Sequence, residues 1–306
     1  MADARTVVVT GASRGLGLAT AAHLHRAGWA VVAAVRSPDP ALERLRVLTG
    51  ASAEDPRLVA VPLDLDDPDS IEAAAATILD TVGAPDGVVH NAGMAGVGCL
   101  EELPMPTWEQ MFSTNFFGPV RLTRALLPAM RVAGRGRIVM VSSMGAVRGM
   151  PGISAYSATK GALERWAESL AFEVAPFGLG VTVLVAGSFQ TDILELTQTF
   201  ADPDGPYAAL HHGLETSGRR FLRFAQPPER FAPAVERALG EQRPFSRHGV
   251  GLDSRLLLVG SRLLPTALLQ RLTTRAVGIP RPGALRGDPA QRARVTHHPG
   301  ETEAIG

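Results

Sequence analysis

Two scarce residue types lie close together in this 306-residue chain. Of its 30 basic residues only Lys160 is a lysine, and Lys160 follows Tyr156, one of two tyrosines, by four positions. In a helix that spacing puts both side chains on one face. An ammonium ~4 Å from a phenol, at an effective dielectric of ~20, stabilises the phenolate by ~4 kcal/mol and lowers a pKa near ~10 by about three units. The pair therefore predicts proton exchange with a carbonyl or alcohol oxygen.

A hydroxyl group lies thirteen residues before this tyrosine, at the end of an apolar run. Ser142 and Ser143 both follow Val141 directly. The carboxyl ends of strands are where open α/β sheets bind ligands, and a hydroxyl there can hydrogen-bond a substrate oxygen on which charge develops. On the residues alone, either serine is a candidate for this role.

A glycine-rich segment near the N-terminus predicts a nucleotide site. Gly11, Gly15 and Gly17 lie between a valine-rich run and a helical pattern. Glycine lets the backbone approach a ligand closely, and the free N–H groups of a helix N-terminus attract a pyrophosphate. The spacing is G-x-x-x-G-x-G, which differs from the common G-x-G-x-x-G pattern.

The second apolar run indicates which dinucleotide binds. It ends at Arg36, and no acidic residue occurs before Asp39 to accept a hydrogen bond from the ribose 2′-hydroxyl of NAD. Arg14 lies within the glycine loop. Two guanidinium groups can pair with the 2′-phosphate through charge-assisted hydrogen bonds. The sequence therefore predicts NADP(H).

The elements that position these residues follow from the alternation of apolar runs and helical patterns. The continuous β-branched runs are typical of strands buried on both faces. We expect strands at 6–9, 30–35, 58–61, 87–89, 138–141, 181–185 and 245–250, and helices at 16–27, 40–48, 70–82, 107–130, 155–177 and 228–240. This order predicts an α/β fold, a Rossmann-type doubly wound parallel sheet of about seven strands in a single domain.

The rest of the chain departs from this rhythm. We expect residues 1–250 to form the dinucleotide-binding domain, with a helical substrate lid at about 188–226. Residues 251–280 predict a C-terminal helical extension of two leucine-rich helices, and 281–306 a disordered tail. The leucines of 252–279 favour core packing, although the lid, a second subunit or peripheral contact with a lipid surface are alternatives.

Composition excludes several classes of protein. The formal net charge is zero, which gives no general attraction to nucleic acid. No apolar stretch approaches the ~20 residues of a spanning helix, and Cys99 is the single cysteine. We expect no signal peptide before the first strand. We expect a cytoplasmic protein, a homo-oligomer (dimer or tetramer), and no metal site, since His211 has no carboxylate or cysteine partner at metal-ligand spacing in the sequence.

Over residues 5–250 the chain resembles the short-chain dehydrogenase/reductase family. The matching features are the glycine loop, Asp64, Asn91-Ala92-Gly93, Asn115, Ser143 and the Tyr156-x-x-x-Lys160 pair. The resemblance favours Ser143 over Ser142, puts Asp64 at the adenine ring, and implies a proton relay from Asn115 through an ordered water to Lys160. It also implies that Thr191 reaches the nicotinamide carboxamide, although Ala186 replaces the proline that commonly precedes Gly187.

The resemblance and the residues together define a predicted site. The expected catalytic residues are Ser143, Tyr156, Lys160 and Asn115. The expected cofactor contacts are Gly11, Ser13, Arg14, Gly15, Leu16, Gly17, Arg36, Asp64, Leu65, Asn91, Ala92, Gly93, Tyr156, Lys160, Gly187 and Thr191.

The residues expected around the reacting carbon are apolar: Met144, Val147, Met150, Phe189, Ile193 and the lid aromatics. They predict a small-molecule substrate, a bulky apolar ketone or alcohol. Within the family, the long lid and the extension are most similar to hydroxysteroid and retinol dehydrogenases. The sequence thus predicts an NADP(H)-dependent carbonyl reductase, an oxidoreductase acting on CH–OH groups. A pathway-specific tailoring ketoreductase and a catalytically silent NADPH-binding sensor or scaffold are the alternatives.

Overall fold

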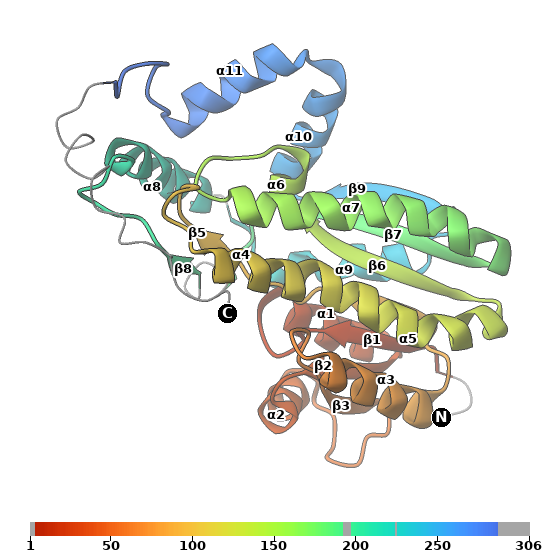
Figure 1. Cartoon of the computed structure of the whole chain (residues 1–306). Helices are drawn as coiled ribbons and strands as arrows, with labels where there is room; N and C mark the ends of the chain where they lie inside the picture. The colour runs from red at the N-terminus through yellow and green to blue at the C-terminus, as the bar shows by residue number, and fades with distance from the viewer. Residues whose placement is uncertain (1–3, 192–196, 224, 287–306) are drawn as a thin grey trace, which may run out of the picture.

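The protein is described by a computed structural model that covers residues 4–191, 197–223 and 225–286. Its centre is a parallel sheet in the order β3-β2-β1-β4-β6-β7-β9 (Figure 1). The strands are β1 Thr6–Thr10, β2 Ala30–Val35, β3 Leu58–Pro62, β4 Gly87–His90, β6 Gly136–Ser143, β7 Leu179–Ala186 and β9 Phe245–Val250. The predicted fold class and strand number are confirmed.

Helices cover both faces of the sheet. One face packs on α3 Pro68–Val82, α5 Gly118–Ala133 and α7 Ser154–Val174, and the other on α1 Gly15–Arg26, α2 Pro38–Thr49 and α9 Ala232–Leu239. Consecutive strand residues serve opposite cores: Val8 packs with the first group, whereas Val7 and Val9 pack with the second. This explains the continuous valine runs, because a strand buried on both faces has no polar side.

Short elements complete the domain around the carboxyl ends of the strands. Here a two-stranded parallel ribbon pairs β5 with β8. The elements are β5 Gly96–Val97, β8 Gln198–Thr199, α4 Met105–Phe112, α6 Met144–Val147, α8 Ala208–Leu222 and the 3-10 turn Pro228–Arg230. At the opposite end of the sheet, a second 3-10 turn, Ala175–Phe177, leads from α7 into the start of β7. Within the predicted lid, the described residues thus form one long helix and a short strand in place of several short helices.

One predicted helix is wrong in its interior. The segment 107–130 was expected to be continuous, but α4 ends at Phe112 and α5 begins at Gly118. A π-helical turn, Ser113–Phe117, joins them. Such turns occur mostly at functional sites, and this one contains Asn115.

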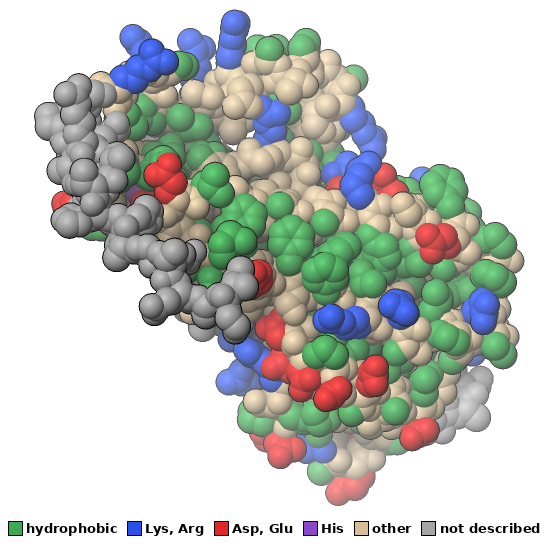
Figure 2. Space-filling view, viewed as in Figure 1, with side chains coloured by type: hydrophobic (Ala, Val, Ile, Leu, Met, Phe, Trp, Pro, Cys, Tyr) green, Lys and Arg blue, Asp and Glu red, His purple; other side chains and the backbone are tan. Residues whose placement is uncertain are grey.

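The C-terminal extension forms α10 Leu252–Leu263 and α11 Thr266–Val277. They stand above the sheet beside α6 and α8, at the edge of the molecule (Figures 1 and 2). Most of their leucines are exposed, so the expectation of core packing is wrong for this segment. None of the described helices is long and apolar enough to cross a bilayer. The predicted tail beyond residue 286 lies outside the described residues.

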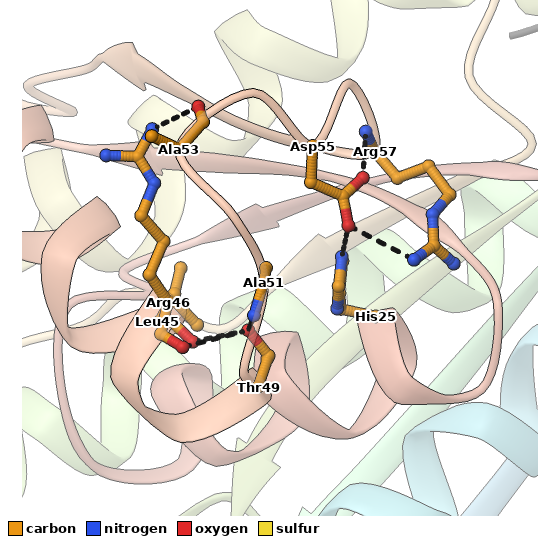
Figure 3. A network of polar contacts seen from close by, with 8 residues as sticks. All are labelled: His25, Leu45, Arg46, Thr49, Ala51, Ala53, Asp55 and Arg57. Atoms are coloured by element: carbon orange, nitrogen blue, oxygen red, sulfur yellow. Dashed lines mark hydrogen bonds and ion pairs between the residues drawn. The ribbon is translucent and has the colours of Figure 1, made fainter.

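A polar network lies in the connection from α2 to β3, the strand at one edge of the sheet (Figure 3). The Asp55 carboxylate accepts hydrogen bonds from the backbone N–H of Arg57 at 2.9 Å, from its guanidinium at 3.1 Å and from His25 Nε2 at 3.0 Å. The backbone hydrogen bond from Arg57 is the main reason that the pKa of Asp55 is lowered. Arg46 donates to the carbonyl oxygen of Ala53 at 2.8 Å. These contacts fix the connection from α2 into the edge strand β3.

Candidate active site

The glycine loop forms a cradle at the carboxyl end of β1. Gly11 has φ +67° and donates from its backbone N to the carbonyl of Ala34, at the end of β2, at 2.9 Å. A Cβ on Gly11 would lie 2.9 Å from the Ala92 Cα, and one on Gly17 would lie 2.3 Å from the Gly11 oxygen. No side chain caps the N-terminus of α1. The cradle therefore requires its glycines and leaves helix N–H groups free for an anion, which fits the pyrophosphate of a dinucleotide.

Asn91 ties this loop to the next strand. Its Nδ2 donates to the Thr10 carbonyl at 3.0 Å, and the Thr10 hydroxyl accepts from the backbone N–H groups of Asn91 and Ala92 at 3.0 and 3.1 Å. The loops after β1 and β4 are thus locked together. Nearby, Asp64 Oδ1 accepts from the Asp66 N–H at 3.0 Å, while the side chain of Leu65 is buried against Gly118.

Three exposed arginines surround the end of β2. Arg14 precedes α1 and Arg36 follows β2, and neither makes an ion pair with any described residue. Arg44 of α2, which sequence reasoning missed, donates to the Ser13 carbonyl at 3.1 Å. The place where a ribose 2′-substituent would lie is therefore cationic.

Tyr156 and Lys160 lie one turn apart on α7, beside the end of β6. The Ser143 side chain lies near the Tyr156 phenol and acts to lower its pKa, and Lys160 Nζ lies 5.9 Å from the centre of the phenol ring. Lys160 is 4% exposed and donates to the Val141 carbonyl at 3.0 Å. The structure separates the two candidate serines, because the Ser142 hydroxyl points to Glu164 instead.

The pKa of Tyr156 differs from the expectation. Burial raises it, and the hydrogen bond from Ser143 lowers it only in part. The ammonium of Lys160 is directed to the Val141 carbonyl, so it does not produce the lowering of about three units that a charge ~4 Å from the phenol would cause. Burial also lowers the pKa of Lys160, to about 8.

Asn115 connects the π-helical turn to both sides of the site. Its Oδ1 accepts from the Met94 N–H at 2.8 Å, and its Nδ2 donates to the Met94 carbonyl at 2.9 Å and to Thr159 Oγ1 at 3.0 Å. A Cβ on Gly93 would lie 3.1 Å from Asn115 Oδ1 and 3.4 Å from Lys160 Nζ. Asn115 thus holds the chain after Gly93 against α7, next to the lysine.

Sequence reasoning missed a buried carboxylate beneath Lys160. Glu164 is 2% exposed, accepts from the Ser142 hydroxyl at 2.6 Å and pairs with Arg247 of β9 at 2.5 Å. Burial raises the pKa of Glu164, and the hydrogen bond from Ser142 and the charge of Arg247 oppose this. Glu164 raises the pKa of Lys160 and so favours its ammonium form. The sequence contains a signal for Glu164. Tyr156, Lys160 and Glu164 occur at intervals of four residues, which puts them on the same face of a helix.

The loop after β7 is held by the C-terminal extension. Asp253, in the first turn of α10, accepts from the Ser188 N–H at 2.7 Å and from the Ser254 N–H at 2.8 Å. A Cβ on Gly187 would overlap this carboxylate, at 2.0 Å from Oδ1. Thr191, at the other end of the loop, lies within 3.5 Å of where a Cβ on Gly15 would be. Asp253 therefore fixes a backbone that lacks the proline common before Gly187.

Replacing this carboxylate tests its part in cofactor binding. We expect Asp253→Asn to raise the Kd for NADPH about tenfold, because the amide has one acceptor oxygen for the two N–H groups of Ser188 and Ser254, and the unpaired one releases the loop. Fluorescence titration measures the Kd. Glu173→Gln, an exposed carboxylate on α7, is the matched control and should leave the Kd unchanged. An Asp253→Asn Kd within twofold of wild type would contradict this positioning role.

A polar cluster joins α8, in the predicted lid, to the loop after β5. His211 of α8 contacts both oxygens of Glu102, at 2.9 and 2.7 Å, and the Cys99 N–H donates to Glu102 at 2.8 Å. The expectation that His211 lacks a carboxylate or cysteine partner is therefore wrong, because the fold supplies partners distant in sequence. One ligand atom each of Cys99, Glu102 and His211 lie within 4.8 Å of one another. Burial, with Glu102, raises the pKa of the Cys99 thiol to about 12, so the thiol stays protonated within this cluster.

The apolar surface next to Tyr156 differs from the one expected. Met94, Trp108 and Phe200 pack together with Tyr156 against buried Leu103 and Met111. Phe189 does not belong to this surface, because it is 6% exposed and packs edge-to-face on Phe231, in the core between the sheet and α9. Met144, Val147 and Met150 are partly exposed near the site, and Ile193 lies outside the described residues.

The fold and the cradle define a class, the oxidoreductases that bind a nicotinamide dinucleotide on a doubly wound sheet. The profile of the short chain dehydrogenase family matches residues 5–201, and the chain belongs to this family. The family prediction from the sequence is confirmed.

Known relatives cover most of the chain. It is 34% identical over 272 residues to the uncharacterized oxidoreductase YbbO of Escherichia coli, spanning 88% of this chain and 93% of that protein. Retinol dehydrogenase 8 of Bos taurus is 34% identical over 258 residues, with 80% and 81% covered. The crystal structure of a short-chain dehydrogenase from Streptomyces avermitilis has a TM-score of 0.74 and 35% identity, and the match covers 91% of this chain and 99% of that one.

Proposed function

We propose that this protein interconverts a ketone or aldehyde and an alcohol on a bulky apolar substrate, with NADP(H). The observation that carries the proposal is the grouping of Ser143, Tyr156 and Lys160 at the carboxyl end of β6, beside the glycine cradle. A bound nicotinamide supplies or accepts the hydride. The residues of the chain orient the substrate oxygen and exchange its proton.

In the direction of reduction, the Ser143 hydroxyl donates a hydrogen bond to the carbonyl oxygen of the substrate. Tyr156 gives its phenolic proton to that oxygen as the alcohol forms, and in oxidation the phenolate takes the proton back. On binding the ribose, Lys160 would leave the Val141 carbonyl, hold ribose hydroxyls and bring its positive charge toward the phenolate. Asn115 fixes the backbone after Gly93, next to Lys160. A proton from solvent would pass from Asn115 through an ordered water to Lys160.

The preference for NADP(H) is supported by the cationic end of β2. Arg36 and Arg14 are free to pair with a 2′-phosphate, and Arg44 adds a third charge. We expect wild-type kcat/KM for NADPH to exceed that for NADH at least tenfold. Arg36→Asp should remove this preference, because a carboxylate at that position repels the phosphate and accepts a hydrogen bond from the 2′-hydroxyl. Initial rates with both cofactors measure it, and equal use of both by the wild type would contradict the assignment.

The substrate class is supported by the surface beside Tyr156 and by one relative. Met94, Trp108 and Phe200 offer apolar contacts, and a relative over four fifths of the chain is a retinol dehydrogenase. NADPH oxidation with a panel of steroid, retinoid and aromatic ketones tests the class. A tailoring ketoreductase would prefer polyketide-like ketones, and a silent NADPH sensor would bind the cofactor without oxidising it with any ketone. The cytoplasmic location and the homo-oligomeric state stay predictions.

A further inference from the structure

The C-terminal helices present an unusual concentration of exposed apolar side chains. Within α10, α11 and the two residues between them, only Ser254, Leu258 and Val277 are buried. Leu256 is 63% exposed and Leu263 is 75% exposed. The exposed large apolar residues of this segment are Leu252, Leu256, Val259, Leu263, Leu264, Leu268 and Leu272, which we call the leucine surface.

The same two helices carry a strong excess of positive charge. Their basic residues are Arg255, Arg262, Arg271 and Arg275, all exposed, and none makes an ion pair with a described residue. Their one acidic residue, Asp253, turns its carboxylate to the backbone N–H groups of Ser188 and Ser254. Figure 2 shows blue side chains along this edge of the molecule. A chain of zero net charge has therefore gathered unpaired cations beside its exposed leucines.

The helices also contact elements that lie near the site. α11 packs on α8 of the predicted lid. Just after α11, the Gly278 carbonyl oxygen lies 2.8 Å from where a Cβ on Gly213 of α8 would be. In turn, α8 packs on the loop before Tyr156, where a Cβ on Gly152 would lie 2.9 Å from Leu214. A partner on the leucine surface is thus one helix away from the apolar surface beside the tyrosine.

We propose that α10 and α11 dock the protein on the surface of an anionic phospholipid bilayer. The leucine surface enters the boundary between headgroups and acyl chains, and the four arginines pair with lipid phosphates. Amphipathic helices with leucines and arginines bind membranes in this way without spanning them. Docking places the predicted lid toward the bilayer, where an apolar ketone or alcohol would dissolve. This benefit of docking rests on the proposed function.

Charge decides between a bilayer and a second copy of the chain. A symmetric dimer through this surface would bring like patches together, so the arginines of both copies would meet with no acidic partner on the same helices. An anionic bilayer offers a phosphate to each arginine and an apolar layer to the leucines. The observations therefore favour the lipid.

Vesicle co-sedimentation of the full chain tests the proposal without cofactor or substrate. We expect binding to phosphatidylcholine vesicles with about a third phosphatidylglycerol, and at least tenfold weaker binding to phosphatidylcholine alone. Leu256→Ser combined with Leu263→Ser, and separately Arg262→Glu combined with Arg271→Glu, should each weaken binding at least tenfold. Val132→Ser combined with Phe172→Ser is the matched control, since both residues are over 80% exposed on other helices, and it should bind as the wild type does.

Three outcomes would overturn the proposal. In the first, the wild type does not bind anionic vesicles. In the second, the control variant loses as much vesicle binding as the leucine variant does. In the third, the leucine variant keeps vesicle binding but changes from a dimer to a monomer in light scattering. The variants leave the catalytic groups in place, so NADPH oxidation with a small water-soluble ketone should match the wild type. Failure to bind vesicles with activity retained rejects docking alone, whereas vesicle binding without activity on any ketone rejects the proposed function.

Discussion

Replacement of Tyr156 by phenylalanine is expected to lower kcat for ketone reduction by about 10³-fold or more, while the Kd for NADPH stays within about threefold. The variant keeps the ring that packs against the apolar residues beside it and removes only the hydroxyl, whose pKa Ser143 influences. General acid catalysis of this kind contributes roughly 10²–10⁴-fold. Steady-state rates and fluorescence titration of NADPH measure the two quantities.

The chain contains its own control for this experiment. Tyr207, the second tyrosine, lies in the lid near Glu101, and Tyr207→Phe should keep most of the wild-type kcat. A Tyr156→Phe variant that retains most of its turnover would remove the phenol from the mechanism. A parallel loss of kcat and NADPH binding would show a general disturbance of the site.

The pKa of Tyr156 also determines how the two directions respond to pH. Burial raises this pKa, so the phenol stays protonated at neutral pH, the form that donates a proton in reduction. The rate of reduction should therefore persist to alkaline pH and fall as pH rises through the raised pKa. Oxidation needs the phenolate and should rise over the same range. Profiles of kcat against pH in both directions check the sign.

Much of the fold could be predicted because its signals are local. The runs 7–9 and 30–35 are apolar without interruption, and only a strand covered on both faces needs such a pattern. Tyr156 and Lys160 are likewise near neighbours, so helical periodicity alone places them on one face. The π-helical turn at Asn115 has no such signal, because the hydrogen bonds of its side chain to Met94 and Thr159 come from segments distant in the chain.

The missed parts of the site depend on contacts between distant segments. Asp253 meets Ser188 across 65 residues of sequence, and His211 meets Glu102 across 109. Phe189 was expected beside the reacting carbon, but its backbone bridges to Gln226 and its ring packs on Phe231. Periodicity describes one element at a time, whereas these contacts join the loop after β7 to α10, and α8 to the loop after β5.

Changing Lys160 should separate function from stability. Its Nζ is buried, donates to the Val141 carbonyl and lies close to Gly93, and a larger planar guanidinium group cannot take the same position without displacing its neighbours. We expect Lys160→Arg to lower kcat at least ~100-fold and to raise the Kd for NADPH about tenfold, because a displaced cation neither stabilises the phenolate nor holds ribose. Lys160→Met, which keeps the apolar stem, should lose a similar amount of turnover.

The methionine variant should nevertheless be at least as stable as the wild type at neutral pH. Burial lowers the pKa of Lys160 from 10.5 to about 8, and such a shift corresponds to roughly 3 kcal/mol of unfavourable free energy in the folded state. Because the folded pKa is below the unfolded one, this cost is complete below pH ~8 and disappears as pH rises through the unfolded value. The stability advantage of Lys160→Met should therefore be largest at pH 7 and shrink by pH 10, as measured by urea unfolding. An advantage that grows with pH would show that the buried ammonium stabilises the fold, and the solitary lysine would then have a structural reason to be retained.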